Sequence, residues 1–428
     1  MRLPIDQARL DLAAGHKTGT FVSGYPGSPF GVLDRNFTAA QAQLEPYDIV
    51  HQPAMNEETA AVAVWGSQQT PRPYSQGRTG VVGIWYGKAP GVDRSGDSFR
   101  HGNFMGVHPG GGVLALAGDD PSAKSSTLPT DSQSSFYDLA FPIIVPSSVQ
   151  DVLDLGLYAV SLSRFSGNWI GFKMVTNLCD GLATVHVRPD REFVLPTVEI
   201  DGVPWQHRQL ASVLTPISLE QETELFGGRL AAAKAHIVAN GINKTVRRSP
   251  EDRLGIVCYG KPFADLTEAL ELLGLTADRH DVPPIRILKL GASYPLPEQT
   301  IREFVDGLSE VLVIEEKRSF VETQINDMLY AAADRPAVLG KRGRDGTPLV
   351  PATGELNQER IGAVLQAWLG LQLPAPPRTQ IVLTPTAAVA AVRRPSAYCS
   401  GCPHSRSTVI PSGALSGGGC GCHSLIYT

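Results

Sequence analysis

Several features of large protein classes are missing from this sequence. No apolar stretch approaches the roughly 18 uncharged residues of a membrane-spanning helix, and charges interrupt the N-terminus where a secretion signal has its apolar segment. Basic residues are fewer than acidic residues. The 37 Lys and Arg against 42 Asp and Glu give a net charge of −5, without the basic clusters of nucleic-acid-binding proteins. We therefore predict a cytoplasmic protein that binds neither membranes nor nucleic acid.

Cysteine is also scarce, and its placement is uneven. Two of the six cysteines are isolated in apolar surroundings, and the other four lie within the last thirty residues, at positions 399, 402, 420 and 422. Scattered pairs would indicate the disulfides of a secreted protein, whereas a terminal cluster in an intracellular chain indicates metal binding.

The spacing within the terminal cluster supports a metal site. Cys399 and Cys402 are two residues apart, which suits one zinc ion or one corner of an iron–sulfur cluster. Either Cys420 or Cys422 offers a third thiolate, and the neighbouring histidines keep zinc as an option.

The remaining composition is that of a globular protein with ample apolar material. At about 150 residues per domain, 428 residues predict two or three domains. In the first part of the chain, strand patterns alternate with helical patterns at 56–69 and 149–164; the strands are expected at 18–23, 81–86, 113–117, 143–145 and 169–175. This alternation predicts an α/β fold with a doubly wound parallel sheet.

A second, smaller alternating unit follows a polar linker at 189–205 and a helical stretch at 209–240. Its strands are expected at 254–259, 285–288 and 311–314, and its helices at 263–273, 299–308 and 320–333. A Pro- and Ala-rich connector at 372–396 then leads to the cysteine cluster.

Three places offer chemistry, each with a plain structural alternative. The loop 24–29 follows a strand where parallel sheets bind ligands, so Ser28 and nearby amides could hold a small anion; a Gly/Pro turn explains it equally well. Glu57 lies in a first helical turn, which suits the helix dipole or a buried pocket. The segment 88–101 is charged and Gly-rich, either a loop with substrate-binding cations or a solvated loop.

Six motifs together resemble the 2-oxoacid:ferredoxin oxidoreductases, most closely the N-terminal part of the fused indolepyruvate ferredoxin oxidoreductases. The motifs are residues 23–29 (SGYPGSP), 56–66, 87–97 (GKAPGVDRSGD), 116–126, 313–318 (VIEEKR) and 399–404 (CSGCPH). The resemblance covers essentially the whole chain.

This resemblance implies a domain order. A pyrimidine-type thiamine-diphosphate domain is expected at 1–182 and a transketolase C-terminal-like domain at 251–345. A linker and helical connector at 183–250 separates them, and a helix with a Pro/Ala-rich connector follows at 346–393. Residues 394–428 resemble the start of a diphosphate-binding domain.

The resemblance also implies an activity. In this family an arylpyruvate such as indolepyruvate is decarboxylated on thiamine diphosphate, which Mg²⁺ helps to hold. The acyl group passes to coenzyme A, and electrons leave through a [4Fe–4S] cluster to ferredoxin. A homo-oligomer is expected of the complete enzyme.

Individual residues acquire roles through the same resemblance. Glu57, rather than Glu58, matches the carboxylic acid that hydrogen-bonds N1′ of the aminopyrimidine, and Gly27 matches a cofactor-binding position. Ser28 matches a residue that contacts the substrate carboxylate, and Arg100 is a weaker candidate for the same anion.

The metal ligands implied by the resemblance are Cys399, Cys402 and Cys422. The doubled cysteine at 420 and 422 leaves open which of the two is the ligand. After Cys402 only 26 residues remain, without a Gly-Asp-Gly motif for Mg²⁺. We therefore expect an N-terminal fragment that is inactive alone. The alternatives are a subunit completed by a neighbouring polypeptide, and a non-catalytic, zinc-binding or regulatory remnant.

Overall fold

We describe a computed structural model of the chain, which covers residues 1–69, 77–210, 212–275, 284–371, 397–415 and 422. The chain divides into two compact units, Met1–Leu373 and Pro374–Thr428. Every helix within the described ranges is too short or too polar to cross a membrane.

The first unit begins with a seven-stranded sheet in the order β12-β5-β6-β4-β3-β1-β2. All neighbouring strands are parallel except β12, which pairs antiparallel with β5. The strands are β1 (Thr18–Gly24), β2 (Ile49–His51), β3 (Gly80–Lys88), β4 (Gly112–Asp119), β5 (Ile143–Ile144), β6 (Trp169–Val175) and β12 (Ala292–Tyr294).

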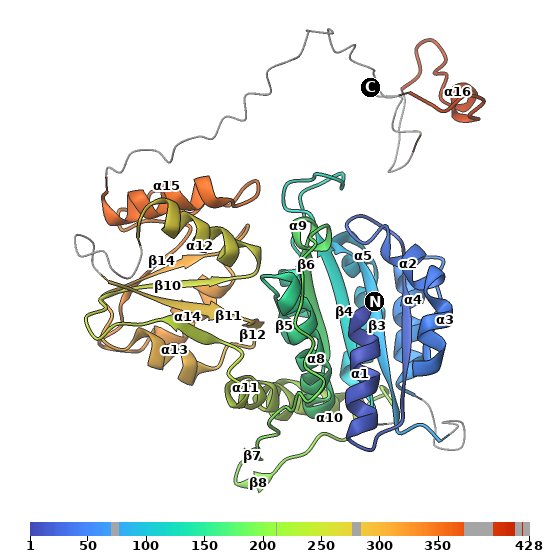
Figure 1. The fold of residues 1–428 in the computed structure, drawn as a ribbon, viewed down its shortest axis with the longest axis horizontal. Helices are drawn as coiled ribbons and strands as arrows, with labels where there is room; N and C mark the ends of the chain where they lie inside the picture. Colours follow the sequence, from blue (N-terminus) through green and yellow to red (C-terminus); the bar gives the residue numbers. More distant parts are fainter. Residues whose placement is uncertain (70–76, 211, 276–283, 372–396, 416–421, 423–428) are drawn as a thin grey trace. The chain divides into compact units, whose positions relative to one another are not determined.

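Helices cover both faces of this sheet (Figure 1). Alternate strand residues point to opposite faces, so Trp85 belongs to the core cluster that contains α4 and α6 residues, while its neighbour Ile84 belongs to the cluster that contains α8 residues. The helices are α1 (Arg2–Ala13), α2 (Leu33–Ala39), α3 (Gln41–Leu44), α4 (Glu57–Ser67), α5 (Ala89–Arg94), α6 (Gly96–Met105), α7 (Gln133–Asp138), α8 (Val149–Ser166) and α9 (Thr176–Cys179). The predicted doubly wound parallel sheet is confirmed.

A hairpin and a helical segment connect the two sheets. The expected linker contains the short hairpin β7 (Glu199–Ile200) and β8 (Val203–Pro204). The helical stretch is α10 (Ile217–Glu224), a π-helical turn (Leu225–Arg229) and α11 (Leu230–Ala239). The buried Arg229 guanidinium fixes this segment to the first sheet's core, since it donates to the carbonyls of Asn103 (2.7 Å) and Gly167 (2.6 Å).

The second sheet has the order β14-β13-β10-β11-β9, with β9 antiparallel and the others parallel. Its strands are β9 (Lys244–Arg247), β10 (Leu254–Tyr259), β11 (Ile285–Leu290), β13 (Glu310–Ile314) and β14 (Ala337–Leu339). Its helices are α12 (Lys261–Leu272), α13 (Glu298–Val305), α14 (Val321–Leu329) and α15 (Gln358–Leu369). The predicted second parallel unit is therefore also present.

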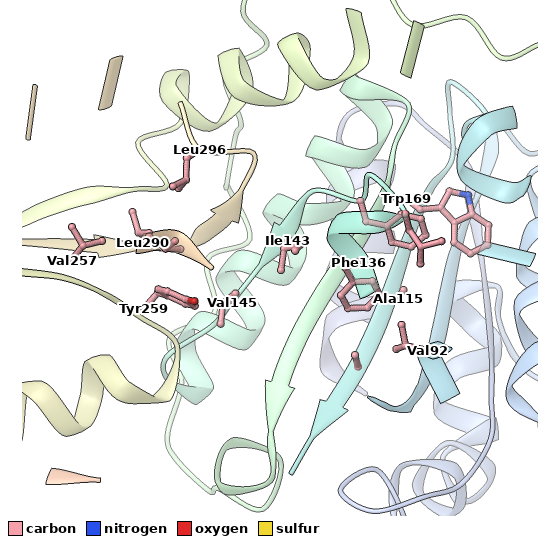
Figure 2. Close-up of a cluster of buried hydrophobic side chains, with 14 of the residues drawn as sticks. Val92, Ala115, Phe136, Ile143, Val145, Trp169, Val257, Tyr259, Leu290 and Leu296 are labelled. Carbon is pink, nitrogen blue, oxygen red and sulfur yellow. The ribbon is translucent and has the colours of Figure 1, made fainter. Parts of the chain in front are cut away.

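The two sheets share one apolar core. Buried side chains continue from Phe136 and Ile143 of the first sheet's layer to Tyr259 and Leu290 of the second (Figure 2). Directly after β11, the chain enters β12 and adds this strand to the edge of the first sheet. The sequence did not predict this strand, because three residues carry no usable periodicity.

The second unit of the chain includes a short helix, α16 (His404–Ser407). The expected connector at 372–396 lies outside the described residues.

Candidate functional site

The candidate site lies at the carboxyl edge of the first sheet, where parallel α/β sheets bind ligands. Strands β1 to β4 are parallel neighbours, so the residues that follow them meet at the same edge. The loop 24–30 follows β1, Glu57 begins α4 shortly after β2, and Lys88 ends β3.

Close glycine contacts show how the loop 24–30 runs. A Cβ on Gly24 would lie 2.2 Å from the Tyr86 carbonyl oxygen, and one on Gly27 would lie 3.5 Å from Lys88 Cδ. Further along, the Pro29 ring packs so closely on Gly118 that a Cβ there would be 2.6 Å away. The loop therefore crosses the ends of β3 and β4, and the predicted place of the turn at a strand end is confirmed.

Ser28 meets a second loop at this edge. Its hydroxyl is hydrogen-bonded to that of Ser125, which belongs to the loop after β4. The buried Asp120 carboxylate shapes that loop by accepting from the amides of Lys124 (2.9 Å), Ser125 (2.8 Å) and Ser126 (2.8 Å). Burial opposes ionisation, but these amide hydrogen bonds outweigh it and hold the pKa of Asp120 below its usual range.

Glu57 is placed by a well-capped helix start. The Asn56 side chain accepts from the Thr59 amide (2.9 Å), and the Thr59 hydroxyl oxygen in turn accepts from the Asn56 amide (3.3 Å). This capping box fixes the first turn of α4, and the helix predicted at 56–69 is present.

The Glu57 side chain is held more closely than that of Glu58. Glu57 is half-buried and Glu58 is exposed. Glu57 packs against Gly91 of α5, where a Cβ would lie 2.6 Å from Glu57 Cγ, and the buried Trp85 donates to its backbone carbonyl (2.9 Å). A half-buried, positioned carboxyl group fits the partner expected for an aminopyrimidine; its role stays a prediction.

The segment 88–101, expected as a charged loop, is helical and forms α5 and most of α6. Val92 and Phe99 are fully buried, while the charged side chains between them face outward. The seven-residue spacing of these apolar positions was hidden by the surrounding Gly and charged residues.

Arg100 lies on the outward face of α6. Its guanidinium is paired with the Asp138 carboxylate (2.5 Å) and donates to the Asp138 carbonyl (3.1 Å). Among the described residues, none of the contacts of Arg100 reaches Ser28 or Gly27. The contacts of Arg100 therefore give no support to an anion site shared by Arg100 and Ser28.

Residues of the second sheet and its loops also contact the loop after β4. Lys317 Nζ donates to the carbonyls of Pro121 and Gly354. The Glu355 carboxylate pairs with Lys124 (3.0 Å) and Lys261 (2.9 Å). Burial alone would raise the pKa of Glu355, but the two lysines outweigh burial and lower it to about 2.

These anchors were not predicted, although Lys317 belongs to the motif 313–318. The separation of 196 residues between Lys317 and Pro121 hides this contact from local pattern analysis.

A buried ion cluster lies beside the same loop. Lys173 Nζ is 2.6 Å from Asp131 Oδ1 and 3.6 Å from Asp119 Oδ2. Burial, only partly offset by Lys173, raises the pKa of Asp119 to about 7. A single lysine within the apolar run 169–175 was the sequence feature that could have indicated a buried partner.

The cysteine segment forms a tight turn. The Cys402 amide donates to the Cys399 carbonyl (3.0 Å), and Gly401 has a φ of 75°, which favours glycine. Both cysteines thus belong to one turn. Within the described residues, no group of three or more His, Cys, Asp or Glu is arranged to hold a metal. Cys422 is exposed, and Cys420 lies outside the described residues.

The described part of the second unit therefore does not assemble an iron–sulfur or zinc site. The ligand set stays a prediction.

The larger cavities found among the described residues lie away from this edge. One of about 840 Å³ is lined by Thr20, Arg78 and Val81 near the beginnings of β1 and β3. Another of about 800 Å³ lies between α1, α8 and the linker.

Comparison with known proteins gives one consistent family. A model of the indolepyruvate oxidoreductase domain matches residues 244–379. The indolepyruvate oxidoreductase subunit IorA of Pyrococcus abyssi is 25% identical over 405 residues, covering 89% of this chain and 54% of the relative. The IorA subunit of Archaeoglobus fulgidus is 25% identical over 386 residues, covering 90% and 56%. These matches make the chain similar to the 2-oxoacid:ferredoxin oxidoreductases and support its membership of that family.

Solved structures agree with this family's fold. A 2-oxoglutarate:ferredoxin oxidoreductase from Magnetococcus marinus, with 2-oxoglutarate, coenzyme A and succinyl-CoA bound, aligns with a TM-score of 0.55 at 11% identity, covering 85% of this chain and 64% of that one. A split-gene transketolase aligns with a TM-score of 0.50 at 13% identity, covering 86% and 98%.

The chain spans about half the length of the curated relatives it matches.

Proposed function

We propose that this chain supplies the aminopyrimidine-binding half of a thiamine-diphosphate-dependent oxidoreductase that acts on indolepyruvate or another arylpyruvate. The observation that supports it best is the placement of Glu57. This carboxyl group is half-buried against Gly91, at the strand edge that also carries the loop 24–30.

The residues at the edge fit thiamine diphosphate and a 2-oxoacid. When bound, the cofactor supplies a carbon nucleophile for the 2-oxo group. Glu57 would share a proton with N1′ of the aminopyrimidine, and Gly27 would allow a close approach of the cofactor to the backbone. Ser28, with Ser125 beside it, would donate a hydrogen bond to the substrate carboxylate.

Other parts of the reaction need groups beyond the described residues. Coenzyme A as acyl acceptor, ferredoxin as electron acceptor, Mg²⁺ and a [4Fe–4S] cluster are proposed from the family alone. The diphosphate grip would come from a further segment or a neighbouring polypeptide, in an assembly that we expect to be a homo-oligomer. We therefore expect no 2-oxoacid-dependent viologen reduction by the 428-residue chain alone.

The turn at Cys399 and Cys402 suits one alternative equally well, a non-catalytic, zinc-binding or regulatory protein. Iron and zinc analysis, with a visible spectrum of the purified chain, separates the two, because iron–sulfur clusters absorb visible light and zinc does not.

The experiment that tests the proposed function compares Glu57→Gln with the matched control Glu58→Gln. Both are made in the assembled enzyme, that is, the chain with the polypeptide that completes it, and phenylpyruvate- and CoA-dependent viologen reduction is measured. We expect Glu57→Gln to lose activity by about 10²- to 10⁴-fold, as for a removed proton-transfer group. The exposed Glu58→Gln should stay near the wild-type rate. Equal rates for the two variants would defeat the assignment.

A further inference from the structure

We propose that Lys88 is the cation that binds the carboxylate of the 2-oxoacid substrate, the role that sequence resemblance offered to Arg100. This inference rests on the proposed function and adds a substrate-binding residue to it.

The position of Lys88 places its side chain beside the loop 24–30, which carries Ser28. Lys88 is the last residue of β3 and lies opposite Gly118 of β4 in the sheet. Its Cδ, Cγ and Cε atoms lie 3.5, 3.7 and 3.9 Å from the point where Gly27 would carry a Cβ. Because Pro29 packs on Gly118, Ser28 lies between two residues that are both fixed to the ends of these strands. The Lys88 ammonium thus extends from a stem that runs along the loop carrying Ser28.

A Cβ at Gly27 would be in ordinary van der Waals contact with the Lys88 methylene groups, so the Lys88 stem packs beside the loop at this point. This packing partly shields the stem, while the charged end of such a side chain can reach water or ligand. Lys88 is accordingly half-buried.

Lys88 differs from the neighbouring cations in its ion-pair partners. Lys124 is paired with Glu355, Lys173 with Asp131, and Arg100 with Asp138. For Lys88, no ion pair or side-chain hydrogen bond is found within the part of the chain that the structure describes. A half-buried lysine without a counter-ion favours the binding of an anion, since a charge-assisted hydrogen bond replaces part of the ammonium's hydration.

The surroundings suit a single negative charge. The loop beside the Lys88 stem carries the neutral hydroxyl of Ser28, which is hydrogen-bonded to that of Ser125 in the loop after β4. One lysine and two uncharged hydrogen-bonding groups are thus brought to this edge. This set balances one carboxylate, whereas a diphosphate would call for further cations. The geometry therefore points to a 2-oxoacid carboxylate and not to the diphosphate of the cofactor.

The test measures binding of two probes to the full 428-residue chain by titration calorimetry. Phenylpyruvate carries the carboxylate, and phenylacetone has the same ring and ketone without it. We expect the wild-type chain to prefer phenylpyruvate. Lys88→Met should weaken phenylpyruvate binding by about 10- to 100-fold, the range for a hydrogen bond to a charged group, and leave phenylacetone binding unchanged.

Further variants keep the test informative. Lys88→Arg retains the charge and should recover much of the preference for phenylpyruvate, which a folding defect would not explain. Arg94→Met, an exposed cation on α5, is the matched control and should change binding by less than about twofold.

The outcomes separate this inference from the proposed function. If Arg100→Met rather than Lys88→Met removes the preference for phenylpyruvate, Lys88 is not the carboxylate cation. If the wild-type chain does not distinguish the two probes, the carboxylate site is not formed by these residues, and the inference is wrong. Either result leaves the proposed function standing as long as the Glu57 and Glu58 variants differ in viologen reduction; loss of that difference refutes the function itself.

Discussion

Replacing Gly91 with alanine should disturb the chemistry without unfolding the protein. The added Cβ would lie 2.6 Å from Glu57 Cγ, and ordinary contact begins near 3.4 Å, so the Glu57 side chain must move by about 0.8 Å. The Glu57 side chain is only half-buried, which lets it yield in place of the backbone.

The expected magnitudes differ for stability and for activity. Alanine stabilises a helix interior by about 1 kcal/mol relative to glycine, which offsets the lower end of the roughly 1 to 3 kcal/mol cost of an overpacked contact. We therefore expect the free energy of unfolding to change by about 1 kcal/mol or less. A displacement near 1 Å of a reacting group costs about 10²-fold in rate, so viologen reduction by the assembled enzyme should fall by that order.

Gly66→Ala is the matched control for this substitution. Gly66 lies in α4, the same helix as Glu57, and its added Cβ meets nothing within 4 Å. This variant should be slightly more stable than the wild type and equally active. The reasoning is refuted if Gly91→Ala keeps the wild-type rate, or if it loses activity only in proportion to a loss of folded protein in thermal unfolding.

Two further predictions concern the loop after β4 and the ion cluster beside it. Glu355→Gln removes the charge that Lys124 and Lys261 contact, so hydrogen exchange of the amides at 124–126 should quicken about tenfold. Glu298→Gln, at an exposed position on α13, is the control. Equal exchange rates in the two variants would contradict the anchoring role of Glu355. The pKa of Asp119 is raised to about 7 in the folded chain. Between about pH 4 and pH 7 the folded chain therefore binds a proton at Asp119 that the unfolded chain has lost. The contribution of Asp119 to the free energy of unfolding consequently falls as the pH rises through this range. Asp119→Asn should flatten that fall in denaturation midpoints measured between pH 5 and pH 8, and an unchanged slope would show that Asp119 is not the group that titrates.

The main strands and helices could be predicted because short apolar runs alternate with helical spacing. The start of α4 was equally accessible, since Asn56 with Thr59 is a local capping pattern. Two features could not be predicted locally. Helices α5 and α6 carry few apolar residues among glycines and charges, and their helical state depends on burying Val92 and Phe99. The contact of Lys317 with Pro121 joins loops whose proximity arises only from the packing of two sheets.

The strand β12 has a consequence for how the chain holds together. Residues 292–294 close the edge of the first sheet beside β5, although they follow directly on a strand of the second sheet. Without them, the backbone groups of β5 on that side would be left open to pairing with another chain. The segment that protects the first sheet from edge-to-edge association therefore lies more than 100 residues beyond the sheet's other strands. A chain cut between the two sheets would lack β12 and would expose the backbone of β5 to pairing with another chain.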